Sequence, residues 1–184
     1  LDLVENETHR CSQIVSGLLS FSRMSPPSFG QVQIDELLQR CILLSQHKLE
    51  LSNIRLESNV QSNLPPVIGD FYQLQQCMIN LFFNAIDAMP DGGTLELSSR
   101  YDTDRDVMIV RVKDSGCGIP GEDLAHIFEP FYTTKKEGYG VGLGLSTVYG
   151  IMEQHHGSVN VESQSGAGTA IILELPVSDS NKDG

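Results

Sequence analysis

The chain has 184 residues, of which 40% are hydrophobic and 20% are charged. This length allows one well-buried domain with a short appendage, but hardly two full domains. The formal net charge of −12 argues against a general nucleic-acid or anionic-membrane binder and suits a positively charged partner. An anionic ligand would therefore have to be held by local dipoles and a few well-placed cations.

The cysteines and the first residues bear on the cellular compartment and on whether the chain is part of a longer protein. No apolar run approaches the length of a membrane span, and no signal peptide is recognised in the first residues. Cys11, Cys41, Cys77 and Cys117 are far apart and form no Cys-x-x-Cys pair, which predicts reduced, partly buried thiols in a cytoplasmic protein. Because the chain begins at Leu1, without methionine and inside an apolar repeat, we expect a piece of a longer protein.

The amino-terminal stretch from Leu1 to Arg23 is predicted to be one helix. Its apolar positions repeat at threes and fours and form a coiled-coil-like seam of Val4, Cys11, Ile14, Val15, Leu18 and Phe21. Pro26 and Pro27 then break the pattern, so residues 25–30 are expected to form a linker. We expect the partner helix of this seam to lie outside the chain.

Helices and strands alternate irregularly through residues 31–177. Val32–Ile34 is predicted to be a short edge strand, and Asp35 is expected to cap a helix from Glu36 to Leu49. Further strands are predicted at 54–59, 66–69, 94–100, 107–113, 157–163 and 169–175, and further helices at 70–88 and 143–155. This pattern predicts a mixed sheet covered by helices on one face, followed by a disordered tail at 178–184.

The helix at 70–88 has an unusual polar face. Its apolar stripe consists of Leu74, Cys77, Met78, Leu81, Ala85 and Ala88. Asn80, Asn84 and Asp87 are spaced by four and three residues and share another face. Because asparagine and aspartate are poor helix formers, these residues suggest a ligand. This helix alone leaves a solvated polar face as an equal alternative.

Three glycine-rich turns follow. In the first, a strand delivers Asp114 to a fixed place, and Gly116 and Gly118 let the backbone turn closely around a flat ligand. A carboxylate there can accept a hydrogen bond from an exocyclic amine such as that of adenine. Taken alone, the motif is more typical of a plain turn. The third turn, Gly166-Ala-Gly-Thr169, indicates only a hairpin by itself.

The second turn runs from Gly138 to Ser146, with glycine at every second position up to Gly144. It leads into a helix, whose free first amides favour anions, and Lys135 and Lys136 stand beside it. We interpret it as a mobile lid over a polyphosphate in preference to an ordinary flexible linker.

In this order the motifs resemble the ATP-binding domain of bacterial two-component sensor histidine kinases. That superfamily also includes type II topoisomerases, mismatch-repair ATPases and heat-shock chaperones. The resemblance covers residues 31–177, and the Phe-Tyr-Thr-Thr-Lys stretch at 131–135 is similar to the nitrogen-regulation branch. It implies an α+β fold, a two-layer α/β sandwich with a mixed, mostly antiparallel sheet. Residues 1–24 resemble the second helix of the family's dimerisation hairpin.

The resemblance also implies an ATP and Mg²⁺ site. Asn84 would be the metal ligand, with Asn80 close to the phosphates and Lys135 approaching the terminal phosphate as catalytic residues. One asparagine and the phosphates suffice, because magnesium takes oxygen ligands and usually keeps water. Asp114 would bind the adenine amino group. The other implied nucleotide contacts are Asp87, Gly116, Gly118, Ile119, Phe131, Gly140, Gly142, Leu143, Gly144, Leu145 and Thr169.

The histidines and Asn80 indicate the reaction. Hydrolysing superfamily members carry a water-activating glutamate at the position of Asn80, so its absence favours a kinase over an ATPase. His9 is followed by Arg-Cys-Ser and does not match the family's phosphoacceptor pattern. His155 and His156, adjacent and diverging, suit a helix end better than a metal site.

We therefore expect transfer of the ATP γ-phosphate to a histidine outside this chain and then to a response regulator. The expected setting is a cytoplasmic domain, dimeric in the full-length protein, with no nucleic-acid partner and a parent that can be membrane-anchored. A nucleotide-binding scaffold without catalysis and a superfamily ATPase remain the alternatives.

Overall fold

The computed structural model describes residues 27–133 and 141–177. The predicted amino-terminal helix and the tail at 178–184 therefore lie outside the described residues. Within the described part, no helix has both the length and the apolar character needed to cross a bilayer. The elements in chain order are β1 Gly30–Val32, α2 Ile34–Leu51, β2 Ile54–Val60, β3 Val67–Gly69, α3 Phe71–Asp87, β4 Gly93–Asp102, β5 Val107–Asp114, α4 Gly144–Gln154, β6 Ser158–Ser163 and β7 Thr169–Pro176.

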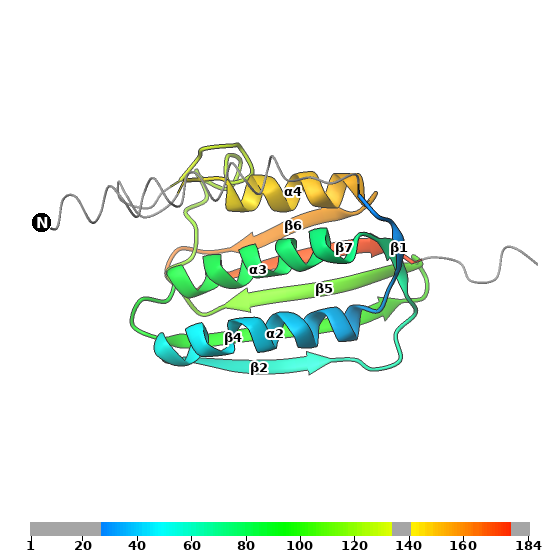
Figure 1. Ribbon diagram of the computed structural model, residues 1–184. Helices are drawn as coiled ribbons and strands as arrows, with labels where there is room; N and C mark the ends of the chain where they lie inside the picture. Colours follow the sequence, from blue (N-terminus) through cyan, green and yellow to red (C-terminus); the bar gives the residue numbers. More distant parts are fainter. Residues whose placement is uncertain (1–26, 134–140, 178–184) are drawn as a thin grey trace, which may run out of the picture.

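Five strands form one mixed sheet in the order β2-β4-β5-β7-β6. Strands β2 and β4 are parallel, and the other neighbouring pairs are antiparallel. Helices α2, α3 and α4 lie side by side across one face of the sheet (Figure 1). Strands β1 and β3 form a separate antiparallel pair at the edge of the sandwich. The predicted α+β sandwich is confirmed.

Alternation along the strands decides which side chains reach the core. On β4, Leu95 and Leu97 are buried, whereas Glu96 between them and Arg100 beyond them are accessible. The pattern places apolar side chains under the helices and polar ones on the open face. This explains why one layer of helices is sufficient for this sheet.

Helix α3 is the central helix of the layer. Asp70 is its N-cap, and Oδ1 of Asp70 accepts hydrogen bonds from the backbone N–H groups of Tyr72 and Gln73. Most of the predicted apolar stripe is buried, but Ala88 is only partly covered, and Phe82 and Ile86 are buried as well. The helix is therefore packed on a wider apolar face than predicted.

The predicted boundary between the first strand and α2 was wrong. The edge strand is Gly30–Val32, not Val32–Ile34, and Gln33 rather than Asp35 is the N-cap of α2. Ile34 is buried as the first helical residue, because it continues the helical spacing of Leu37, Leu38, Cys41, Ser45 and Leu49. Asp35 lies inside the first turn, where its carboxylate accepts a hydrogen bond from the N–H of Glu36.

The described cysteines are free thiols, as predicted. Cys41 and Cys77 are buried between α2 and α3, and Cys117 is exposed. Burial raises the pKa of Cys41 to about 12 and raises the pKa of Cys77 as well. The two buried thiols are therefore neutral core residues.

Candidate functional site

The first half of the site, here called the sheet end, lies where β5 ends beside the start of β7. Asp114 and Thr169 are paired in register across these strands. Oδ1 of Asp114 accepts hydrogen bonds from the N–H of Gly116 at 2.8 Å and from the N–H of Thr169 at 3.3 Å. Within the described residues, no group donates to Oδ2. This oxygen is available for a donor from outside the chain.

Burial controls the ionisation of Asp114. The residue is only 6% exposed. Loss of hydration raises the pKa of Asp114, and backbone N–H groups of Gly116, Thr169 and Asp114 itself partly oppose that shift. A buried carboxylate with one oxygen free of protein donors is suited to accept from an external amine, because an unpaired buried carboxylate oxygen is costly.

The glycines of the first turn are required by chain packing. A Cβ on Gly116 would collide with the carbonyl oxygen of Ala88, at the end of α3. A Cβ on Gly118 would collide with the carbonyl oxygen of Gln164, and Gly118 has a φ of +69°. The turn is thus pressed between α3 and the β6–β7 hairpin, which brings three distant segments to one place.

Ser163 completes the sheet end and was not predicted. Its Oγ accepts a hydrogen bond from the N–H of Ile119 at 2.8 Å, donates to the carbonyl of Gly168 at 3.0 Å and lies 2.8 Å from Oγ1 of Thr169. One hydroxyl therefore ties the first turn to the third. The predicted hairpin would have set Ser163 opposite Thr169, but nothing in its residue type marks it.

The second half, here called the helix end, is formed by the polar face of α3 and the first turn of α4. Nδ2 of Asn80 donates to the carbonyl oxygen of Gly144 at 3.4 Å. A Cβ on Gly144 would lie 3.3 Å from Nδ2 of Asn84. The asparagines of α3 and the glycine-rich start of α4 therefore lie in contact.

The first turn of α4 provides backbone donors. Its N-cap, Leu143, forms no side-chain cap. The hydroxyls of Ser146 and Thr147 both donate to the carbonyl oxygen of Leu143, so neither caps the first amides. Helix α4 has 11 residues, enough for a dipole whose positive end meets Asn80 and Asn84. This arrangement favours an anion at the helix end.

The two halves belong to one site. The N–H of Cys117, in the first turn, donates to the carbonyl oxygen of Ala88 at 3.1 Å. Ala88 follows Asn84 by four residues, which is a rise of about 6 Å along a helix. The end of α3, the end of β5 and the start of α4 all lie at the same end of the sandwich (Figure 1, left).

The other predicted nucleotide contacts differ in their exposure to solvent. Asp87 is exposed at the last turn of α3, while Ile119, Gly142, Leu143 and Leu145 are partly buried. Phe131 is 69% exposed, has a φ of +67° and donates its N–H to the carbonyl of Gly142. Lys135 and Gly140 lie outside the described residues, so their predicted roles stay predictions.

The histidine pair has the predicted helix-end role. His155 is the C-cap of α4, and His156 follows it. In the described part of the chain, no group of three or more histidine, cysteine, aspartate or glutamate side chains could hold a metal ion. A cation at the helix end would therefore depend on the amide oxygen of Asn84 and on oxygens of its ligand, which suits Mg²⁺.

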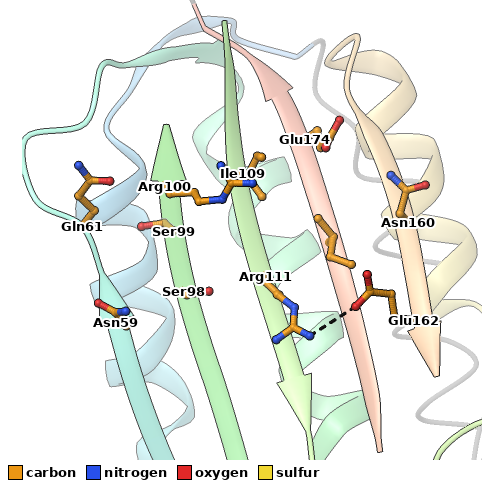
Figure 2. Close-up of a pocket in the computed structure, with 11 residues that line it drawn as sticks. Asn59, Gln61, Ser98, Ser99, Arg100, Ile109, Arg111, Asn160, Glu162 and Glu174 are labelled. Atoms are coloured by element: carbon orange, nitrogen blue, oxygen red, sulfur yellow. Dashed lines mark hydrogen bonds and ion pairs between the residues drawn. The ribbon is translucent and has the colours of Figure 1, made fainter. Parts of the chain in front are cut away.

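A separate groove of about 770 Å³ lies on the open face of the sheet. Figure 2 shows its side chains, including the ion pair of 3.5 Å between Arg111 and Glu162. It is lined by Asn59, Gln61, Ser98, Ser99, Arg100, Ile109, Arg111, Asn160, Glu162, Ile172 and Glu174. None of the predicted site residues is among them, because the helices that carry the asparagines cover the opposite face.

Comparison with known proteins identifies the family. Residues 69–179 match the model of the histidine kinase-, DNA gyrase B- and HSP90-like ATPase family. Over 176 residues the chain is 32% identical to sporulation kinase E of Bacillus subtilis. The match covers 96% of this chain and 23% of that protein, so the chain spans about a quarter of the length of that relative.

Two solved structures extend the comparison. The catalytic domain of histidine kinase ThkA is 31% identical with a TM-score of 0.72, over 82% of this chain and 96% of that domain. A structure of ThkA in complex with the response regulator TrrA is 28% identical with a TM-score of 0.78, over 98% of this chain and 51% of that chain. This chain therefore belongs to the histidine kinase-, DNA gyrase B- and HSP90-like ATPase family, and its described part has the fold of a histidine kinase catalytic domain.

Proposed function

We propose that this chain binds ATP with Mg²⁺ across the sheet and helix ends and transfers the γ-phosphoryl group to a histidine outside the chain. The observation that carries the proposal is that Asp114 and the contact between α3 and α4 lie at the same end of the sandwich. The turn after Asp114 is hydrogen-bonded to the end of α3. This end of the sandwich offers an amine acceptor and an anion-favouring helix start, joined by one turn of α3. Phosphoryl transfer depends mainly on positioning and charge neutralisation.

At the sheet end, Oδ2 of Asp114 would accept from the exocyclic amine of adenine. Thr169 supports this geometry through its N–H on Oδ1 of Asp114, and Ser163 holds Thr169 through its hydroxyl. This arrangement selects adenine over guanine, because guanine carries a carbonyl oxygen where adenine carries its amine, and two facing acceptors repel.

At the helix end, the oxygen of Asn84 would ligate Mg²⁺, and the first amides of α4 would hold the phosphates. The bound metal would neutralise charge on the transferred group. Lys135 would supply a cation at the terminal phosphate, although that residue lies outside the described part of the chain. Because the whole chain carries a net charge of −12, these local dipoles and cations would have to overcome a repulsive background.

Asn80 favours a kinase over a hydrolase. Its Nδ2 is directed to the carbonyl oxygen of Gly144. An amide has no useful basicity, so Asn80 cannot take a proton from an attacking water as a carboxylate would. The phosphoryl group would then pass to the acceptor histidine that a dimerisation hairpin presents.

The proposed partners follow from the histidine kinase relatives. Residues 1–24 would form the second helix of the dimerisation hairpin, residues 25–30 a linker, and the full-length protein a homodimer. A response regulator would receive the phosphoryl group from the histidine, and the ThkA–TrrA complex supports this partner class.

The test is a calorimetric titration of the protein with a non-hydrolysable ATP analogue, with and without Mg²⁺, and with the GTP analogue for comparison. Binding that is strengthened by Mg²⁺ and specific for adenine is expected. A second assay supplies γ-labelled ATP and a separate histidine-bearing hairpin. Label on the hairpin supports the kinase, free phosphate alone would support an ATPase, and the absence of any binding would leave only a scaffold.

A further inference from the structure

Helices α3 and α4 are joined by two hydrogen bonds, one near the middle of α3 and one at its start. At the helix end, Asn80 donates to Gly144. At the opposite end, the backbone N–H of Asp70 donates to Nε2 of His155 at 2.9 Å. The two contacts are 10 residues apart on α3 and 11 residues apart on α4, about 15 and 17 Å at the helical rise. The helices therefore run antiparallel (Figure 1), and the two contacts are separated by similar lengths along them.

Both ring nitrogens of His155 are used. Nε2 accepts from Asp70, and Nδ1 lies 2.7 Å from the carbonyl oxygen of Ile151. The two bonds fix the neutral tautomer with hydrogen on Nδ1, because Nε2 must offer a lone pair and Nδ1 must donate. His155 is 2% exposed. Burial lowers its pKa, the hydrogen bond to the carbonyl of Ile151 and the carboxylate of Asp70 oppose this shift, and the neighbouring His156 adds to it.

Asp70 also holds the leading segment, Ser28–Val32, which joins the preceding part of the chain to this domain. While Oδ1 caps α3, Oδ2 accepts from the N–H of Ser28 at 2.7 Å. The ring of Phe29 lies on the ring of His155, with centroids 4.9 Å apart. A Cβ on Gly69 would lie 2.8 Å from Cδ2 of His155, so the approach of the ring requires glycine there.

We propose that Asp70 and His155 are positioning residues that make nucleotide affinity depend on how the leading segment is seated. They form a clamp that joins the start of α3 to the end of α4, and the two rigid helices carry that alignment to Asn80 and Gly144. Displacement of Ser28 and Phe29 would loosen the clamp and misalign the helix end. This inference rests on the proposed function, because nucleotide binding at that end is part of it.

Two substitutions at one position separate this role from simple packing. His155→Gln places an amide oxygen close to the position of Nε2 and keeps an acceptor for the N–H of Asp70. His155→Asn can still donate to Ile151 but leaves that buried N–H without its acceptor. We expect His155→Asn to weaken binding of the ATP analogue about tenfold, and His155→Gln to bind within about twofold of the unsubstituted protein.

Asp70→Asn tests the leading segment. Asparagine still caps α3 through Oδ1, but its amide group would face the N–H of Ser28, donor against donor. Asp35→Asn removes an equal charge from the first turn of α2 and serves as the control. Affinity should fall about threefold in Asp70→Asn and stay unchanged in Asp35→Asn. In His155→Asn, addition of Asp70→Asn should cost less than it does alone, because the clamp is already open.

Amide hydrogen exchange in the nucleotide-free protein is the closing experiment. We expect faster exchange at residues 147–150 of α4, whose amides are hydrogen-bonded within the helix, in His155→Asn and Asp70→Asn, with little change in His155→Gln and Asp35→Asn. Exchange there that is equal in all four variants, or equal affinity of His155→Asn and His155→Gln, would overturn the proposal. If the unsubstituted protein binds no nucleotide, the proposed function fails, and the exchange pattern still decides whether the clamp exists.

Discussion

The sheet end and the helix end are built by different physical means. At the sheet end, strand register fixes Asp114 opposite Thr169, and hydrogen bonds of 2.8 to 3.3 Å connect Asp114, Ser163 and the turns. At the helix end, the two helices meet through one long hydrogen bond of 3.4 Å between Asn80 and Gly144. The base would thus meet a preformed site, whereas the phosphates would meet two helices whose alignment depends on contacts elsewhere.

The difference has an electrostatic side. Asp114 is buried with a raised pKa, so the fold loses stability by keeping it ionised. Asn80 and Asn84 are neutral, and no ionised group needs to be desolvated to present them. In such a site, Asp114 would set the selectivity for the base, and Asn80 and Asn84 would set the affinity for the phosphates.

Asp114→Asn should produce the largest loss of nucleotide affinity, and it changes only the sheet end of the site. The amide group replaces Oδ2 and faces the adenine amine as a second donor, so affinity for the ATP analogue should fall about 100-fold, the upper range for a hydrogen bond to a charged group. Calorimetry measures this loss, with Asp91→Asn in an exposed turn as control. Affinity within a factor of three of the unsubstituted protein would contradict the role of Asp114.

The same variant tests the stability of the sheet end. Because the pKa of Asp114 is raised in the folded state, the unfolded chain ionises first as the pH rises through the ordinary value of about 3.9. Stability is therefore lost as the pH rises from there to the folded pKa. Asp114→Asn removes this loss, so its free energy of unfolding in urea at pH 7 should be no lower than that of the unsubstituted protein.

Asn84→Ala should weaken the helix end by removing the proposed metal ligand. We expect about a tenfold loss of affinity with Mg²⁺ and little change without it, because only the metal-dependent part of binding is removed. Asn160→Ala on the open face of the sheet is the matched control. An equal loss with and without Mg²⁺ would assign Asn84 to the phosphates rather than to the metal.

Gly144→Ala and Gly150→Ala should separate an effect on nucleotide affinity from an effect on stability. The added methyl group would lie 3.3 Å from Nδ2 of Asn84, so affinity should fall about threefold as Asn84 moves aside. Gly150→Ala, in the same helix, meets nothing within 4 Å. It should stabilise the protein by about 0.5–1 kcal/mol with no change in affinity, because alanine is the better helix former. Equal affinities of the two variants would show that Gly144 does not constrain the site.

A pH titration of stability should give the smallest effect. His155 has a lowered pKa in the folded state, so the unfolded chain binds more protons below about pH 6.5, the ordinary histidine value. The free energy of unfolding should fall as the pH drops from about 6.5 to the folded pKa and be insensitive to this histidine above that range. Urea unfolding should show that His155→Gln abolishes this slope, whereas His47→Gln, at an exposed position of α2, leaves it. A slope retained in His155→Gln would assign it to another group.

Much of the fold could be predicted because its signals are local. The alternation of the strands, the period of the central helix and the hairpin around 164–168 each specify an element without reference to the rest of the chain. The start of α2 was misplaced because Val32 and Ile34 alternate like a strand, and only their packing shows that Ile34 belongs to the helix. Local pattern and tertiary burial disagree at that boundary.

The sequence by itself determined the residue types of the site: an aspartate after a strand, asparagines at helical spacing and glycines before a helix. The tertiary structure decided which of these residues meet. Ser163 and the pair of Asp70 with His155 act through partners up to 85 residues away. No local period encodes such contacts, because hydrogen-bond partners across a sheet or between helices are chosen by the packing of the whole domain.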